Sequence, residues 1–253
     1  MPGLLSEVTP VILTRDEEAN VGRTLAQLAW AREVIVLDSE STDRTRAIAE
    51  SFPNVRFVTR PFDDLASQWN AAVSMVTTEW ILTLDADYFV PDEFAAEVDA
   101  LPPVADAWEA EFVYAVNGRP LRASLYTPRP VLLRRGAFVI YMDGHTQRTR
   151  SLGITGRLSA RIVHDDRKSL RRFIDRQKRY MRDEAAKLRA LRWRHANTAA
   201  RIRKLRVVAP FAVALHTLLV KRAILDGPAG WRYALERVIA ELILSWELIR
   251  GGS

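Results

Sequence analysis

Residues 80–87, WILTLDAD, are an apolar run that ends in two aspartates. Three similar apolar runs precede it, VTPVILT at 8–14, EVIVLD at 33–38 and VRFVTR at 55–60. Segments with helical periodicity separate these runs, at 17–31, 41–52 and 66–76. Apolar strands that alternate with helices predict an α/β fold, with a mostly parallel sheet covered by helices on both faces.

Polar residues follow three of the predicted strands at their carboxyl ends. The segment LTRDEEAN comes after the first strand, Asp38 closes the second, and Asp85 closes the fourth. In open α/β sheets, ligands bind in the crevice beyond the carboxyl ends of the strands. We therefore expect these three clusters to converge on one ligand site.

The aspartates of the DAD triplet predict a divalent cation site. Asp87 can bind the cation, while Asp85 can reach a ribose or a metal-bound water. Mg²⁺ and Mn²⁺ prefer such oxygen ligands and usually bridge the oxygens of a diphosphate. A solvated surface loop is the alternative, but the apolar strand before the triplet favours the functional interpretation.

The segment DSESTD (38–43) has a structural alternative, because Ser, Thr and Asp commonly cap helices. A cap at Ser41 or Thr42 explains those two residues without requiring Asp38. The carboxylate of Asp38 is well placed to contact a ribose hydroxyl or a base.

Together these segments resemble the inverting GT-A glycosyltransferases of family 2, particularly the lipopolysaccharide-core β-glucosyltransferase subgroup. The matching features, in order, are TRDEEANVGRTL, DSESTDRT, the pair Gln68 and Asn70, and the DAD triplet. The resemblance covers roughly residues 8–92. It implies a Rossmann-like GT-A fold and metal-dependent transfer of a sugar, with inversion, from a nucleotide diphosphate donor such as a UDP-sugar.

The resemblance also implies which residues bind the donor. Thr14, Arg15 and Glu17 would line the nucleotide pocket. Gln68 and Asn70 would belong to the same donor-binding region.

The same resemblance assigns roles to three carboxylates. Asp38 would contact the uracil or ribose, Asp85 the ribose and the metal shell, and Asp87 the metal, Mg²⁺ or Mn²⁺. The subgroup commonly reads DADE, but Tyr88 stands in place of the final Glu here. No role of that Glu is therefore carried over to this chain.

The segment YMDGHTQR (141–148) resembles the acceptor side of the same group. Inverting transfer needs a base that removes the proton of the acceptor hydroxyl. Asp143 is the predicted base and His145 the alternative, although His145 can also serve only to order its loop.

The segment ARIVHDDRKSL (160–170) and the helix after it supply further candidates. His164 follows an apolar strand and resembles the histidine that completes the metal or diphosphate site in GT-A folds. A structural histidine is the alternative. Arg171 and Arg172 can stabilise the departing diphosphate, although a solvated helix face explains most cations of this stretch.

Charge divides the chain into an acidic and a basic part. Residues 1–143 hold 12 Lys and Arg against 22 Asp and Glu, whereas residues 144–253 hold 25 against 9. Such asymmetry suggests a metal-binding region and a region suited to an anionic surface. We predict a catalytic domain over 1–165 and a basic, helical C-terminal region over 166–253.

The segment VVAPFAVALHTLLV (207–220) has Lys and Arg on both sides, at 201–206 and 221–222. An apolar body with basic margins is typical of a helix that lies on an anionic membrane. A buried core helix or a homodimer interface are the alternatives. No run of 18 apolar residues and no secretion signal occur. We expect a cytoplasmic protein, peripheral on the inner face of the cytoplasmic membrane, with a glycan or lipid-linked acceptor in cell-envelope or lipopolysaccharide synthesis.

Two other classes of protein fit less well. A sugar-nucleotide pyrophosphorylase needs a glycine-rich loop after the first strand, and LTRDEEAN has no glycine. The isoelectric point near 9.9 suggests a nucleic-acid binder. No nucleic-acid-binding motif supports that class, and the acidic N-terminal part opposes it, so we expect no nucleic-acid partner. Cysteine is absent, which excludes thiolate metal sites and disulfides.

Overall fold

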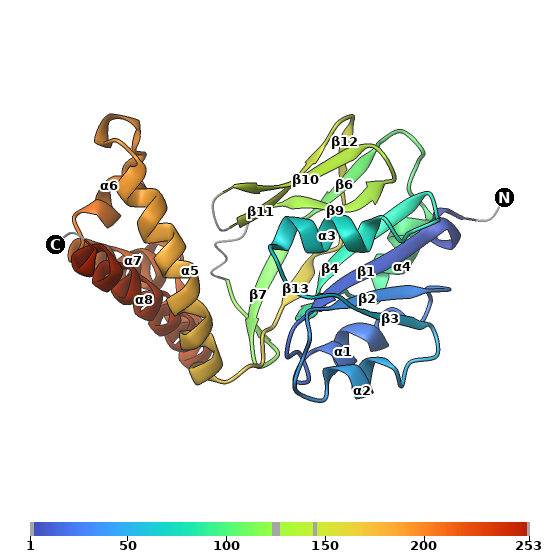
Figure 1. Ribbon diagram of the computed structural model, residues 1–253, viewed down its shortest axis with the longest axis horizontal. Coiled ribbons are helices and arrows are strands. Elements are labelled where there is room, and N and C mark those ends of the chain that lie inside the picture. The colour runs from blue at the N-terminus through green and yellow to red at the C-terminus, as the bar shows by residue number, and fades with distance from the viewer. Residues whose placement is uncertain (1–2, 123–126, 144–145, 252–253) are drawn as a thin grey trace. The chain divides into compact units, whose positions relative to one another are not determined.

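The computed structural model describes residues 3–122, 127–143 and 146–251. The chain forms two compact units, shown in Figure 1. The first comprises Met1–Val113 and Tyr126–Arg167, and the second comprises Tyr114–Leu125 and Lys168–Ser253. The functional division expected at residue 165 stays a prediction.

A seven-stranded sheet in the order β12-β6-β9-β4-β1-β2-β3 forms the centre of the first unit. Its strands are β1 (Val8–Thr14), β2 (Val34–Asp38), β3 (Val55–Thr59), β4 (Trp80–Asp85), β6 (Ala107–Ala110), β9 (Arg129–Arg134) and β12 (Thr155–Arg157). Strands β4, β1, β2 and β3 are mutually parallel, and β12 is parallel to β6, whereas β9 is antiparallel to both β4 and β6. The mostly parallel sheet predicted from the apolar runs is confirmed.

Helices cover both faces of this sheet, as Figure 1 shows. They are α1 (Val21–Ala26), α2 (Thr45–Ala49), α3 (Leu65–Val73) and α4 (Glu93–Asp99). Alternate residues of a strand point to opposite faces. Ile12 accordingly packs with α1, α2 and α4, whereas its neighbour Val11 packs with α3. Both faces of the central strands are therefore buried, as their continuous apolar runs require.

The helices predicted over 17–31 and 41–52 are shorter in the structure, where they span Val21–Ala26 and Thr45–Ala49. The predicted cap at Ser41 or Thr42 is wrong. α2 begins only at Thr45, because the Asp43 carboxylate accepts hydrogen bonds from the backbone N and the Oγ of Thr45, at 2.9 and 2.5 Å. The residues between Asp38 and Thr45 instead form a loop at the carboxyl edge of the sheet.

Shorter strands complete the first unit. They are β5 (Tyr88–Phe89), which pairs antiparallel with β13 (Ile162–His164), and β10 (Phe138–Asp143), which pairs antiparallel with β11 (Thr146–Ser151). Ile140 of β10 is buried in the same cluster as Trp69 of α3. A 3₁₀ turn, η1 (Leu4–Glu7), precedes β1.

The second unit is mainly helical. Its helices are α5 (Leu170–Ala190), η2 (Trp193–His195), α6 (Thr198–Lys204), α7 (Val208–Leu215), the π-helical η3 (His216–Val220), η4 (Ala223–Asp226) and α8 (Gly227–Arg250). α8 packs against both α5 and α7. A short β-hairpin joins β7 (Phe112–Val116), which begins in the first unit, to β8 (Arg119–Pro120).

The stretch 196–224 of the predicted helical region does not form one continuous helix. Arg206 separates α6 from α7 and Arg222 follows η3, and both adopt left-handed backbone conformations, with φ of 63° and 58°. A left-handed residue cannot continue a right-handed helix, so the stretch is divided into short helices.

No single helix of the described ranges is long and apolar enough to cross a membrane. Val208–Val220 and Ala223–Arg250 meet the length and composition of a span only as a pair, with a bend of 68° between them.

Candidate active site

The DAD triplet (85–87) starts at the last residue of β4 and ends just before β5. Strand β5 pairs with β13. Pairing of β5 with β13 sets His164 opposite Tyr88. The Nε2 atom of His164 consequently lies 3.0 Å from Oδ2 of Asp87, and both side chains are only about a tenth exposed, at 11% and 12%. The two residues predicted as metal ligands are therefore adjacent, although 77 residues separate them in the chain.

The electrostatic surroundings of His164 are acidic. Burial of the imidazole opposes its charged form, but the charge of Asp87 and its hydrogen bond outweigh this, with smaller contributions from Asp85 and Asp166. The net effect is a pKa of His164 above its ordinary value. A histidine that binds a metal must be neutral, so a cation here would bind in exchange for that proton.

Arg129 is close to both Asp85 and Tyr88. The sequence did not single out this arginine. The Asp85 carboxylate is about half exposed and 4.0 Å from Nη2 of Arg129. The same Arg129 donates a hydrogen bond to the Tyr88 hydroxyl and lies over the rings of Tyr88 and Phe112. The Tyr88 ring also meets the His164 ring edge-on, with centroids 5.4 Å apart. Tyr88 therefore packs as a buried aromatic side chain beside His164.

Thr14 and Asp38 form a buried pair at the ends of β1 and β2. Thr14 Oγ1 donates to Oδ1 of Asp38 over 2.7 Å, and the Ser41 hydroxyl and backbone N donate to the same carboxylate at 2.5 and 2.7 Å. Asp38 is only 3% exposed. This carboxylate therefore orders the turn after β2, and its predicted contact with the uracil or ribose stays a prediction.

The loops after β1 and β2 are joined by reciprocal hydrogen bonds. The backbone N of Asp16 donates to the Ser41 hydroxyl at 2.8 Å, and the Asp16 carboxylate accepts from the backbone N of Thr42 at 2.9 Å. The backbone N of Glu17 donates to Thr45 Oγ1 at 2.7 Å. Asp16, at φ 53°, is thus a loop-ordering residue that the sequence analysis missed.

The start of α1 is tied to the segment that follows β13. Arg23 donates to the carboxylate and the backbone carbonyl of Asp165, at 3.1 and 2.8 Å, and Arg167 Nε donates to the same carboxylate at 2.9 Å. Asn20 Nδ2 donates to both Glu17 and Asp166. The segment HDDR (164–167) is the sequence feature that indicated these contacts, because its two aspartates follow directly on His164, the predicted metal ligand.

Gln68 and Asn70, predicted near the donor, both donate to backbone carbonyls. Gln68 Nε2 donates to Pro61 O at 2.8 Å and holds the loop after β3. Asn70 Nδ2 donates to Ile140 O of β10 at 3.2 Å. Arg15 lies with its guanidinium 5.6 Å from the centre of the exposed Phe62 ring, which belongs to the same loop. Their donor contacts stay predictions.

The predicted acceptor-side residues are less constrained. Asp143 ends β10 with an exposed carboxylate, 3.6 Å from Nε of Arg148. His145 lies outside the described residues. Arg171 and Arg172 lie on exposed positions in the first turn of α5, in the second unit. Their roles stay predictions.

The residues at the β4 edge fit a divalent cation by their chemistry. Asp87 offers carboxylate oxygen, His164 offers imidazole nitrogen, and the exposed Asp85 lies two residues from Asp87. Within ranges 3–122, 127–143 and 146–251, no three His, Asp or Glu are already gathered around one point. Mg²⁺ and Mn²⁺ commonly take only one or two carboxylates from the protein and the remaining ligands from substrate phosphates and water. Asp87 and His164 are thus enough protein ligands for such a cation.

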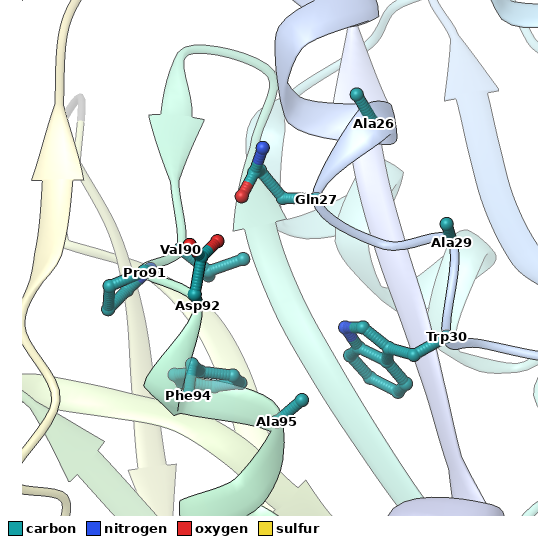
Figure 2. A pocket seen from close by; sticks show the side chains of 9 residues that line it. All are labelled: Ala26, Gln27, Ala29, Trp30, Val90, Pro91, Asp92, Phe94 and Ala95. Atoms are coloured by element: carbon teal, nitrogen blue, oxygen red, sulfur yellow. The ribbon is translucent and has the colours of Figure 1, made fainter.

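A shallow hollow of about 300 Å³ lies elsewhere in the first unit. Figure 2 shows its lining between the end of α1 and the start of α4, with the rings of Trp30 and Phe94 and the polar ends of Gln27 and Asp92. No residue predicted to bind donor or metal lines it.

The family model for glycosyl transferase family 2 matches residues 10–154. The match covers more than half of the chain. The chain belongs to glycosyl transferase family 2, and it is an enzyme.

Curated relatives agree with this assignment. An uncharacterized glycosyltransferase of Rickettsia bellii is 35% identical over 97 residues, which are 38% of this chain and 33% of the relative. The lipopolysaccharide core biosynthesis glycosyltransferase LpsC of Rhizobium meliloti is 30% identical over 134 residues, 51% of this chain and 48% of LpsC. The matched region therefore spans between a third and a half of these relatives.

Among solved structures, residues 1–349 of TarS from S. aureus, crystallised with UDP-GlcNAc, align with a TM-score of 0.50. The alignment covers 97% of this chain and 92% of that one at 16% identity. At this identity the likeness shows a shared fold.

Proposed function

We propose that this enzyme transfers a sugar, with inversion, from a nucleotide diphosphate sugar to a glycan or lipid-linked acceptor, and that it requires Mg²⁺ or Mn²⁺. The donor we favour is a UDP-sugar. The observation that carries the proposal is the 3.0 Å contact between Asp87 and His164 at the carboxyl edge of β4. In sheets of this kind, nucleotides bind at that edge.

Asp87 and His164 would hold the cation, with Asp85 reaching the ribose or a metal-bound water. The cation would supply positive charge to the diphosphate oxygens as the bond to the sugar breaks. Arg129, 4.0 Å from Asp85, would add a fixed guanidinium at the same edge. Thr14 and Asp38 would keep the two nucleotide loops in place through their hydrogen bond.

The acceptor half of the reaction needs a proton acceptor. Asp143 would take the proton of the acceptor hydroxyl while its oxygen attacks the anomeric carbon, opposite the departing diphosphate. His145 is the alternative base. Arg171 would stabilise the charge on the leaving diphosphate.

The relatives suggest a cell-envelope context. LpsC is named for lipopolysaccharide core biosynthesis, and its similarity extends over half of this chain. TarS was crystallised with UDP-GlcNAc and shares this fold. These likenesses support a UDP-sugar donor and an envelope glycan as acceptor.

The test measures nucleoside diphosphate released from UDP-glucose, UDP-GlcNAc and GDP-mannose, with Mn²⁺ or with a chelator. We expect release from a UDP-sugar that the chelator abolishes. Asp87→Asn should lower it by at least about a thousandfold, because loss of a metal ligand removes several kcal/mol of transition-state stabilisation.

Asp92→Asn is the matched control, since Asp92 is an exposed aspartate of the same unit and lies outside the site. It should keep full activity. Chelator-resistant release, or equal activity in the two variants, would overturn the metal assignment. Release from GDP-mannose alone would overturn the UDP preference.

A further inference from the structure

Helix α8 is apolar on two opposite faces. One face packs inside the second unit, with Tyr233, Leu244 and Leu248 buried. The opposite face exposes an apolar stripe that recurs every three to four residues, except for one longer step in the middle, and consists of Trp231, Leu235, Leu242, Trp246 and Ile249. A helix at a water-facing surface normally carries polar residues on its outer side. The outer stripe of α8 therefore indicates that a second apolar environment contacts this helix.

Helices α7 and η3 repeat this pattern beside α8, against which α7 packs. Their exposed apolar side chains are Val208, Phe211, Leu215 and Leu219, again at helical spacing. Phe211 is 69% exposed, although it is one of the largest apolar residues of the unit. We call this stripe and the outer stripe of α8 together the outer face.

The tryptophans separate the outer face from ordinary surface. Trp231 and Trp246 of the outer face are 53% and 63% exposed, and Trp193, elsewhere in the second unit, is 52% exposed. Tryptophan is favoured where an apolar phase meets water, because its ring is apolar and its N–H is polar.

The second unit carries an excess of cations. Residues 168–253 hold 20 Lys and Arg against seven Asp and Glu. Several of those carboxylates are used inside the unit, since Glu184 and Glu241 pair with Arg203, and Glu247 pairs with Arg182. The surplus positive charge therefore remains on the surface of this unit.

Two of these cations lie at the ends of the α7–η3 stripe. Arg206 precedes α7 and Arg222 follows η3, and both are exposed and left-handed. That backbone conformation favours glycine and is strained for arginine. Exposed arginines thus occupy both turns where glycine would be more stable.

We propose that the outer face rests on the surface of an anionic lipid bilayer. The apolar stripes would enter the boundary between headgroups and acyl chains, and the arginines would meet lipid phosphates. The inner side of α8 carries Glu236, Glu241 and Glu247, so lipid can cover the helix on one side only. The helices accordingly lie along the membrane surface.

A second copy of the chain is the competing occupant. A two-fold contact through the outer face would bring like-charged margins together, which opposes association. Anionic lipid instead neutralises that charge. The surface charge therefore favours the membrane over a homodimer.

The first experiment sediments the full chain with vesicles of phosphatidylcholine, with and without phosphatidylglycerol. We expect binding to the anionic vesicles, weak binding to the neutral ones, and a loss in 1 M salt, where the screening length is about 3 Å. Each cation near the surface strengthens binding roughly fivefold, so Arg201→Glu, Arg206→Glu and Arg222→Glu together should weaken it at least a hundredfold or so. Arg203 is left intact because it pairs with buried carboxylates.

The apolar part is tested by Phe211→Ser with Trp246→Ser, which should also abolish binding. The matched control is Leu152→Ser with Ile154→Ser, because these residues are equally exposed, at 59% and 66%, but belong to the first unit. The control variant should bind like the original chain. Equal losses in both double variants would overturn the proposal.

Tryptophan fluorescence quenching tests the proposal on the original chain, so its result does not depend on whether a variant folds. Brominated acyl chains quench tryptophan fluorescence only on contact, and the exposed tryptophans of the second unit should be quenched on anionic vesicles. No quenching would overturn the proposal. A dimer that Phe211→Ser with Trp246→Ser converts to a monomer, without any vesicle binding, would assign the outer face to a second copy instead.

Discussion

The two units of this molecule treat the same residue type in opposite ways. In the first unit Trp69, Trp80 and Trp108 are 4–7% exposed and lie in the core, Trp30 packs partly buried against it, and the polar residues of the candidate site lie at one sheet edge. In the second unit every tryptophan is at least half exposed. The first unit thus presents carboxylates, hydroxyls and an imidazole at one edge, as a small polar ligand requires. The second presents apolar side chains with a basic margin, which suits an extended surface.

The carboxylates follow the same contrast. In the first unit Asp38 and Asp85 end β2 and β4, and Asp87 follows two residues later, at the edge where we propose that the nucleotide binds. In the second unit Glu184 and Glu241 are internal partners of Arg203 and serve to hold helices together. The same residue type therefore has a proposed chemical role in one unit and a packing role in the other.

After Asp87, the largest effect is expected at Asp143, the predicted base in the first unit. Asp143→Asn should reduce turnover by ~10²–10⁴, because the acceptor hydroxyl loses its proton acceptor. Donor binding should hardly change, and calorimetric titration of the nucleotide measures this. His145→Ala is the parallel variant, and only the true base loses turnover while keeping donor affinity. Full activity in both variants would place the base elsewhere.

A smaller effect is expected at Arg203, whose loss should weaken only the second unit. Arg203→Met leaves Glu184 and Glu241 near each other, with side chains 14% and 9% exposed. The free energy of unfolding should fall by about 2–3 kcal/mol, less than for a fully buried pair because the guanidinium is 36% exposed.

Denaturant unfolding measures that change. Nucleotide binding is the control, because most residues predicted to bind the nucleotide lie in the first unit. A parallel variant, Arg201→Met, removes an exposed arginine from the same helix and should have almost no effect. Equal stability of the two variants would contradict the internal role of Arg203.

The smallest effect is expected at Thr14, within the first unit. Thr14→Val removes the 2.7 Å hydrogen bond to the buried Asp38 and should destabilise the unit by about 1–2 kcal/mol. Thr14→Ser keeps the hydroxyl and should restore most of this stability. Thermal unfolding compares the two, and an equal loss in both would mean that the methyl group matters instead of the hydrogen bond.

The sheet could be predicted from the sequence because its strands are continuous apolar runs. β1 occupies Val8–Thr14, the same residues as the run VTPVILT, and β4 begins and β2 ends as expected. Helix lengths were harder to predict. The side chains of Asp43 and Ser41 compete with helical hydrogen bonds, and periodicity does not detect such local competition.

The site could be predicted in part. The aspartates of the triplet lie next to an apolar strand, which identified the edge, and the HDDR segment suggested His164. The partner residues Arg129 and Arg23 could not be found, because they come from distant segments and isolated arginines carry no local pattern. Exposure of the outer face was equally invisible, since VVAPFAVALHTLLV is apolar whether it is buried or exposed.

The central claim is that Asp87 and His164 hold a cation that binds the nucleotide. Electron paramagnetic resonance of free Mn²⁺, titrated with the protein in the presence of UDP, tests it directly because bound Mn²⁺ loses its sharp signal. The original chain and Asp92→Asn should deplete free Mn²⁺ equally. Asp87→Asn should bind it more than ~100-fold more weakly, since loss of even an outer partner of a metal ligand costs 10–100-fold. Equal depletion by Asp87→Asn would contradict the account.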